Sequence, residues 1–322
     1  MNTYKTYITV CLGIVFIITI LIIMRYDNIL FSQLNKAAST DPLNTIHKTQ
    51  KTPRVTGNGD FRTLPKPWHN DWLTLHEEKG QTFEQFISSN YYRPDSIRNI
   101  IYLQPFWIFN ENATSFLGLL AGFAQRYFAM PVRLLPAVSP PKSRFAPRQN
   151  PFSSLKFQVH TDSILVYLLN LIPEDAFCIL GITSIDLYPA PGWNYVFGCA
   201  SRADRVGVFS LTRLDPAFYG ANEKNDNNKL FLLRSCKILS HEAGHLYGME
   251  HCISYHCNMN GSNDIHESDA QPIYLCPVCL RKLQHVLGFN LHERYKKLHT
   301  FYLGNGLAEQ AQWVTKASIR KK

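Results

Sequence analysis

The chain has 322 residues, 45% of them hydrophobic, which is enough to bury a sizeable core in one or two domains. Its net charge of +9 is carried by the two ends, +5 over residues 1–66 and +7 over 281–322, so the part between them stands at −3. Because that body is not a basic platform, nucleic-acid binding has little support, and we predict none.

The first predicted element is a membrane span. Residues 7–24 form an 18-residue run without a charge, YITVCLGIVFIITILIIM, which is just long enough to cross a bilayer. The alternative is a cleaved signal peptide, but its apolar part would be shorter and a small-residue cleavage site would follow it, where this chain has MRYD. We therefore predict a single-pass anchor, preceded by a short tail at 1–6 and followed by a flexible linker at 25–66.

Apolar periodicity then predicts one folded body over 67–300, followed by a basic tail at 301–322. The predicted elements are, in order, a helix in 65–89, a strand in 97–109, a helix in 113–128, a strand in 132–138, a helix in 155–172, a buried central strand in 176–188 and a strand in 206–214.

The next helix carries a metal-site pattern, HEAGHLYGMEH, at 241–251. His241 and His245 are four residues apart and so lie on one helical face, where both can bind one metal ion. Glu242 follows the first histidine, at the general-base position of HExxH hydrolases. Gly248 can take a positive φ, end the helix and turn the chain so that His251 becomes the third ligand. The fourth position stays open for water, as a catalytic zinc site requires.

Four cysteines follow in two pairs, with the spacing C-x4-C and C-x2-C. Paired thiolates separated by a loop are typical of a closed, structural zinc site, and two disulfides or four buried free thiols are the alternatives. These cysteines are Cys252, Cys257, Cys276 and Cys279. We therefore predict two Zn²⁺ ions per chain, one catalytic and one structural. Met259, between the two patterns, matches the methionine that metzincins place in a tight turn beneath their histidines, although a plain core methionine is the alternative.

At these residues the chain resembles the archaemetzincins, whose signature is HExxHxxGxxHCxxxxCxM followed by CxxC. The resemblance extends to 173–189 and 193–213 and covers roughly residues 70–300. It implies an α+β, metzincin-like fold with a mixed twisted sheet flanked by helices, here with an N-terminal transmembrane helix added. It also implies a zinc metallopeptidase with an aminopeptidase preference for short peptides, and a cleft whose upper edge is the strand before the catalytic helix.

The expected chemistry is hydrolysis of a peptide by zinc-bound water, with Glu242 accepting the water proton and passing it to the departing amine. Tyr255 and Tyr274 are candidates for holding the oxyanion, and Glu267 or Asp269 for meeting the ammonium of an aminopeptidase substrate. For Glu267 the alternative is a solvated or helix-capping side chain. An inactive zinc-stabilised scaffold is the alternative function, although Glu242 has no purpose in such a protein. The chain is expected to act as a monomer on peptide substrates.

The side of the membrane is predicted from a glycosylation sequon and the thiols. The sequon Asn260-Gly261-Ser262 directly follows Met259, where a packed turn could not accommodate a glycan. Four zinc-binding thiolates persist better in a reducing compartment. We therefore predict a catalytic domain that faces the cytoplasm. A soluble intracellular or a luminal protein is the alternative, and a second sequon at Asn112 would report a luminal location.

Overall fold

The computed structural model describes residues 61–107, 111–151, 157–220 and 225–319. They all lie within one compact unit, 55–322. The predicted span at 7–24 and most of the predicted linker lie outside the described residues. Among the described helices none is both long enough and apolar enough to cross a bilayer.

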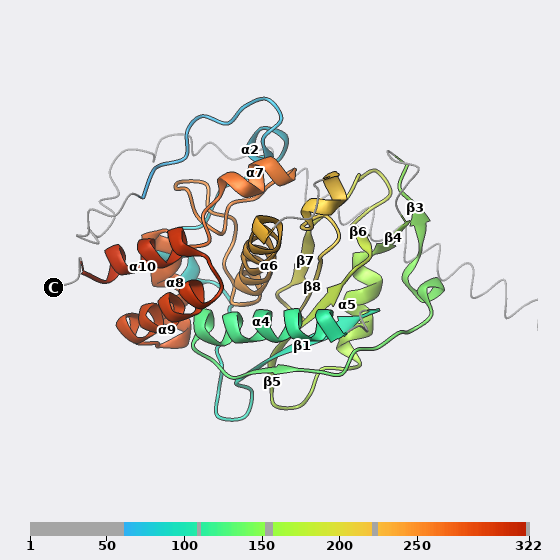
Figure 1. Ribbon diagram of the computed structural model, residues 1–322, viewed down its shortest axis with the longest axis horizontal. Coiled ribbons are helices and arrows are strands. Elements are labelled where there is room, and N and C mark those ends of the chain that lie inside the picture. The colour runs from blue at the N-terminus through green and yellow to red at the C-terminus, as the bar shows by residue number, and fades with distance from the viewer. Residues whose placement is uncertain (1–60, 108–110, 152–156, 221–224, 320–322) are drawn as a thin grey trace, which may run out of the picture. The chain divides into compact units, whose positions relative to one another are not determined.

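The main sheet has five strands in the order β2-β1-β5-β8-β7 (Figure 1). Four of them run parallel, and β7 pairs antiparallel with β8 at one edge, so the sheet is mixed as predicted. The strands are β1 (Ile100–Phe106), β2 (Val132–Leu134), β5 (Ala176–Thr183), β7 (Gly198–Ser201) and β8 (Val206–Ser210).

Helices cover both faces of this sheet, because its strands carry apolar side chains on both. Ile101 and Leu103 of β1 belong to the core under α4 (Glu111–Phe128) and α6 (Asn225–Leu246). The alternate residues Ile100 and Tyr102 belong to a second core with α5 (Thr161–Leu169). The prediction of a sheet flanked by helices is therefore confirmed.

A smaller sheet, β3-β4-β6, stands beside the main one and corrects two predictions. The predicted helix in 155–172 begins as strand β4 (Phe157–His160), which pairs with β3 (Arg148–Gln149) and β6 (Asp186–Tyr188) before α5 starts. The predicted strand in 176–188 is two strands, β5 and β6, which belong to different sheets.

The predicted helix in 65–89 is two short ones, α2 (Trp72–Leu75) and α3 (Phe83–Ser88), separated by a turn in which Gly80 has φ +64°. The ordered body also begins earlier than predicted, because Thr63 forms an antiparallel bridge with Tyr255.

The prediction of a basic tail at 301–322 is wrong for the part that the structure describes. Three helices form the last part of the described chain: α8 (Pro277–Leu287), α9 (Leu291–Gly304) and α10 (Ala308–Ile319). Cys276 caps α8 and Cys279 lies in its first turn. Figure 1 shows them gathered at one end of the body. Leu307, Ala311 and Val314 are buried in the main core, which makes α10 part of the folded body.

Candidate metal centres and cleft

Helix α6 ends where the sequence predicts, between the second and third histidines. Gly248 has φ +88°, its N–H donates to His245 O at 2.9 Å, and the Met249 N–H donates to Gly244 O at 3.3 Å. These two bonds form a Schellman motif, which requires a left-handed residue after the helix. The motif reverses the chain and directs His251 back toward α6.

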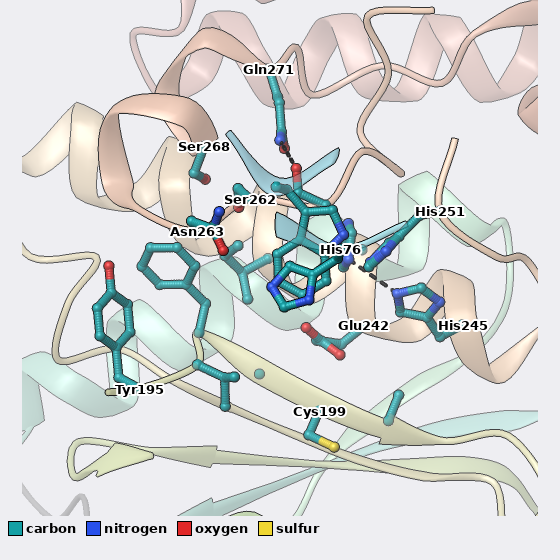
Figure 2. A pocket seen from close by; sticks show the side chains of 18 of the residues that line it. His76, Tyr195, Cys199, Glu242, His245, His251, Ser262, Asn263, Ser268 and Gln271 are labelled. Atoms are coloured by element: carbon teal, nitrogen blue, oxygen red, sulfur yellow. Dashed lines mark hydrogen bonds between the residues drawn. The ribbon is translucent and has the colours of Figure 1, made fainter. Parts of the chain in front are cut away.

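The structure brings His241, His245 and His251 together. Figure 2 shows the last two of these beside each other. One ligand atom from each of the three lies within 4.8 Å of the others, and the Nε2 atoms of His241 and His245 are 3.1 Å apart. Burial keeps both of these imidazoles neutral, because it lowers the pKa of His245 to about 3 and holds the pKa of His241 well below its ordinary value. A neutral imidazole keeps the lone pair that a metal ion needs.

Each of the three rings is oriented from behind by a hydrogen bond at Nδ1. His241 is bonded to Asn258 O at 2.7 Å, and His245 to Met249 O at 2.8 Å. His251 differs, because its partner is the carboxylate of Glu78, at 2.6 Å. When Nδ1–H donates, Nε2 presents its lone pair, so all three rings are set as ligands of one ion.

Glu78 was not found from the sequence. Its Oε1 also accepts the indole N–H of Trp72 at 2.7 Å. Burial acts to raise the pKa of Glu78, but the hydrogen bonds from His251 and Trp72 outweigh it, and the pKa is lowered. In the sequence Glu78 stands in a polar stretch, HEEK, 173 residues before His251, and no local pattern marks it.

Glu242 lies beside the three histidines and faces the cleft (Figure 2). Its side chain is only 6% exposed, and burial raises its pKa to about 8. A dication held by the histidines would act in the opposite direction and favour the carboxylate. Gly198 on β7 makes room for Glu242, since a Cβ there would lie 2.5 Å from Glu242 Oε1.

Met259 lies directly beneath the catalytic helix and is fully buried. A Cβ on Gly244 would lie 2.5 Å from the Met259 sulfur, so the helix and the methionine turn are in close contact. Because Gly244 stands between Glu242 and His245, this contact supports the middle of the metal-binding pattern.

The four cysteines form the second cluster, with their sulfur atoms all within 4.8 Å of one another. They are free thiols, with Cys252 and Cys276 sulfurs 3.7 Å apart, which excludes the predicted alternative of two disulfides here. Backbone N–H groups of Cys276 and Met259 point at the sulfur of Cys257. Hydrogen bonds with the neighbouring thiols lower the pKa of Cys252. A buried tetrad of sulfurs with backbone donors fits a closed zinc site.

Between the histidines and β7 lies a cavity of about 690 Å³. Trp72, His76 and Trp193 are among the residues that line it. The ring centroids of Trp72 and His76 are 4.0 Å apart, and His76 stacks on Trp193 at 5.2 Å. The prediction that the strand in 206–214 forms the upper edge is corrected, because β8 is paired on both sides and β7 is the edge strand of the described sheet.

The other predicted site residues lie away from the cavity. Both Glu267 oxygens accept backbone N–H groups, from Trp72 and from Asn263, so Glu267 holds the rim in place. Asp269 forms a bidentate pair with Arg234. Tyr274 stacks on Trp313 at 3.8 Å, and Tyr255 does not line the cavity. A role for Glu267 in substrate binding stays a prediction.

The chain is similar in sequence to proteins that are already known. The family model described as Peptidase family M54 matches residues 144–285. Archaemetzincin-2 of Rattus norvegicus is 39% identical over 268 residues, which cover 75% of this chain and 74% of that protein. Archaemetzincin-1 of Homo sapiens is 34% identical over 258 residues, 72% of this chain and 52% of that protein. Among solved structures, archaemetzincin from Methanopyrus kandleri is 26% identical, with a TM-score of 0.48, covering 61% of this chain and 99% of that chain. With its three histidines, its buried glutamate and this degree of identity, the chain belongs to the archaemetzincin family of zinc metallopeptidases.

Proposed function

We propose that the chain is an aminopeptidase that cleaves short peptides, with one catalytic and one structural zinc ion. The observation that carries the proposal is the buried carboxylate of Glu242 beside three histidines whose metal-binding nitrogens converge. A scaffold would not need a carboxylate there, because burying one without a partner is costly.

A zinc ion held by His241, His245 and His251 would supply Lewis-acid activation of the attacking water and of the scissile carbonyl. Glu242 accepts the proton of that water at its carboxylate and then donates it to the nitrogen of the departing amine. The outer edge of β7 is free of any partner strand among the described residues and can pair with an extended peptide backbone.

Two features of the cleft support short substrates with a free amino end. The rings of Trp72, His76 and Trp193 contact one another where they line the cavity, and they limit the room for a long substrate. Apart from Glu242, Glu250 is the only carboxylate among the described residues that line the cavity, and it can meet a substrate ammonium.

The test is hydrolysis of a peptide library by the full-length, zinc-loaded chain, with free and N-acetylated versions of each peptide. We expect cleavage after the first residue and a strong loss on acetylation. Glu242→Gln should abolish cleavage while the zinc content stays the same. Equal cleavage of free and acetylated peptides would reject the aminopeptidase assignment, and turnover that survives Glu242→Gln would reject the mechanism.

We further propose a single-pass anchor at 7–24 with the catalytic body in the cytoplasm. Two observations support this orientation. The four clustered cysteines are arranged as a tetrad that can bind zinc and are not joined in disulfides, and such thiolates persist better in a reducing compartment. The side chain of Asn260 is 5% exposed and bonded to Cys257 N, Cys252 O and Tyr255 O, so the folded sequon cannot carry a glycan. Protease protection of intact vesicles checks the proposal, and a protected domain that loses mass on deglycosylation at Asn112 would overturn it.

A further inference from the structure

One of the residues that line the cavity has a buried ammonium group. Lys237 stands on α6 one helical turn before His241 and lines the same cavity, yet its residue is only 4% exposed. Side chains four residues apart on a helix are neighbours, so this ammonium lies on the same face as the first metal ligand.

The partners of Lys237 are two backbone oxygens. Its Nζ donates to Ser268 O at 2.5 Å and to Gln271 O at 3.0 Å. An ammonium group has three N–H donors, so one donor is left for another acceptor.

No carboxylate among the described residues lies within ion-pairing distance of this ammonium. Its neighbour Asp269 is held by Arg234, with both oxygens engaged at 2.9 and 2.6 Å. Glu267, on the same short helix α7 (Ile265–Ala270), is bonded to backbone N–H groups instead. A buried charge without a counter-ion is costly unless an opposite charge joins it.

Lys282 provides a comparison within the same chain. It is 2% exposed on α8, and its ammonium also donates to neutral oxygens, those of Gln81. The fold therefore tolerates a buried lysine on neutral acceptors. What distinguishes Lys237 is its position, because it lines the cavity and Lys282 does not.

The wall around Lys237 is polar and carries no competing negative charge. Ser262, Asn263, Ser268 and Gln271 follow one another along it (Figure 2). The side-chain amide of Gln271 is tied to Gly261 O at 2.7 Å, which holds this wall in shape. This wall thus presents neutral polar groups around one buried cation, whereas the other cation that lines the cavity, Arg202, is exposed.

We propose that Lys237 is a specificity-determining residue that binds a carboxylate of the peptide substrate. The inference rests on the proposed peptidase function and adds a substrate class to it, namely peptides that bring an acidic group into the cleft. Two sources share this chemistry: the side chain of an Asp or Glu residue next to the scissile bond, and the terminal carboxylate of a dipeptide.

The experiment compares matched peptides with the full-length, zinc-loaded chain. Pairs that differ only by Glu or Gln are placed on each side of the scissile bond, and dipeptides are compared with their C-terminal amides. We expect kcat/KM to be about 10- to 100-fold higher for the acidic member of one pair, because a hydrogen bond to a charged group contributes a free energy of that order. A Glu/Gln difference identifies the side chain as the source, and an acid/amide difference identifies the terminal carboxylate.

Two variants assign this preference to Lys237. Lys237→Met should remove the preference for acidic peptides, and Lys237→Arg should keep part of it. Lys282 is a buried lysine outside the cavity, so Lys282→Met is the matched control and should leave the Glu/Gln and acid/amide ratios as in the parent chain. A ratio that persists in Lys237→Met, or no ratio in the parent chain, overturns the proposal.

A binding measurement separates this result from the peptidase function itself. Calorimetry with the Glu242→Gln chain reads the affinities of the same peptide pairs without turnover, and adding Lys237→Arg to that chain assigns any difference to Lys237 if Lys237→Met does not fold. Tighter binding of the acidic peptides without any cleavage by the parent chain would uphold Lys237 and reject the peptidase function. Cleavage of both members of each pair at the same rate would uphold the peptidase function and reject the role of Lys237.

Discussion

At the scale of single residues, Gly198 controls where the catalytic carboxylate can stand. Gly198→Ala would place a methyl group 2.5 Å from Glu242 Oε1, so the carboxylate must move. We expect kcat/KM to fall by about 100-fold, since a displacement of about 1 Å has such an effect, while the zinc content stays unchanged. Gly118→Ala is the control, because a Cβ there meets nothing within 4 Å. Equal activity of the two variants would contradict this role.

Glu78 is a positioning residue that acts through the third metal ligand. Because its carboxylate is bonded to His251 Nδ1 at 2.6 Å, Glu78→Gln should weaken zinc binding at the histidine site by about 10- to 100-fold. Competition with a chelator measures the affinity independently of activity. Glu77→Gln changes the exposed neighbouring carboxylate and should have no effect. An unchanged affinity in Glu78→Gln would show that the main-chain turn alone orients His251.

We also predict that the preference for acidic peptides depends on pH through the charge of Lys237. Burial lowers its pKa to about 8, while Asp269 acts to raise it and Arg234 to lower it. Only the charged form attracts a carboxylate, so the preference for acidic peptides should be full below this pKa and be lost as the pH rises through about 8. The ratio of kcat/KM for each Glu/Gln pair, measured between about pH 6 and pH 10, checks this. Using a ratio cancels the titration of Glu242 and of zinc-bound water, which both peptides share.

At the scale of elements, α10 joins the two ends of the described chain. Its Trp313 stacks on Tyr274 at 3.8 Å and meets the edge of Phe61 at 6.0 Å. Tyr274 stands two residues before Cys276, the first of the second cysteine pair, and its carbonyl accepts the Asn258 N–H in the methionine turn at 3.0 Å. The last helix therefore stabilises the segment that links the two metal clusters.

Loss of the contact between Trp313 and Tyr274 should lower the free energy of unfolding by a measurable amount. Trp313→Ala removes a half-buried aromatic ring and its stack, for which we expect a loss of about 2–3 kcal/mol in the free energy of unfolding. Urea titration gives the value, and Trp68→Ala is the control, since Trp68 is 77% exposed. If both variants unfold at the same urea concentration, the stack of Trp313 on Tyr274 contributes nothing to the stability of the body.

At the scale of the whole molecule, the two metal clusters are expected to have separate effects. The histidine cluster opens onto the cavity, whereas the cysteine sulfurs are packed in the main core. Replacing His245 by Ala should remove one zinc equivalent and the activity while leaving the thermal midpoint close to that of the parent chain. Replacing Cys276 by Ser should lower the midpoint strongly, because structural zinc contributes about 10–16 kcal/mol in zinc-finger peptides.

Metal analysis alongside thermal unfolding distinguishes these outcomes. A purified, active chain with a single zinc equivalent would reject the two-site proposal. So would a Cys276→Ser chain that unfolds at the same temperature as the parent, because a site that stabilises nothing is not structural.

The sequence by itself determined the parts of the site that are local in the chain. His241, His245 and Gly248 follow from helical periodicity and a left-handed helix end, and the cysteine pairs from their short spacing. The apolar runs of β1 and β5 and the periodicity of α4 were equally visible, because elements that are buried against flanking layers carry apolar side chains in a regular pattern.

Only the tertiary structure decided the residues whose roles depend on distant contacts. Glu78 meets His251 across 173 residues, and a carboxylate in a polar stretch has no local sign of such a partner. Lys237 resembles any lysine of a polar helix until α7 closes over it and buries its ammonium. Strand pairing makes β7, and not β8, the edge of the main sheet. Packing of Trp313 on Tyr274 shows that α10 belongs to the folded body and is not a tail. Burial and pairing of this kind are properties of the assembled core, which a local pattern does not encode.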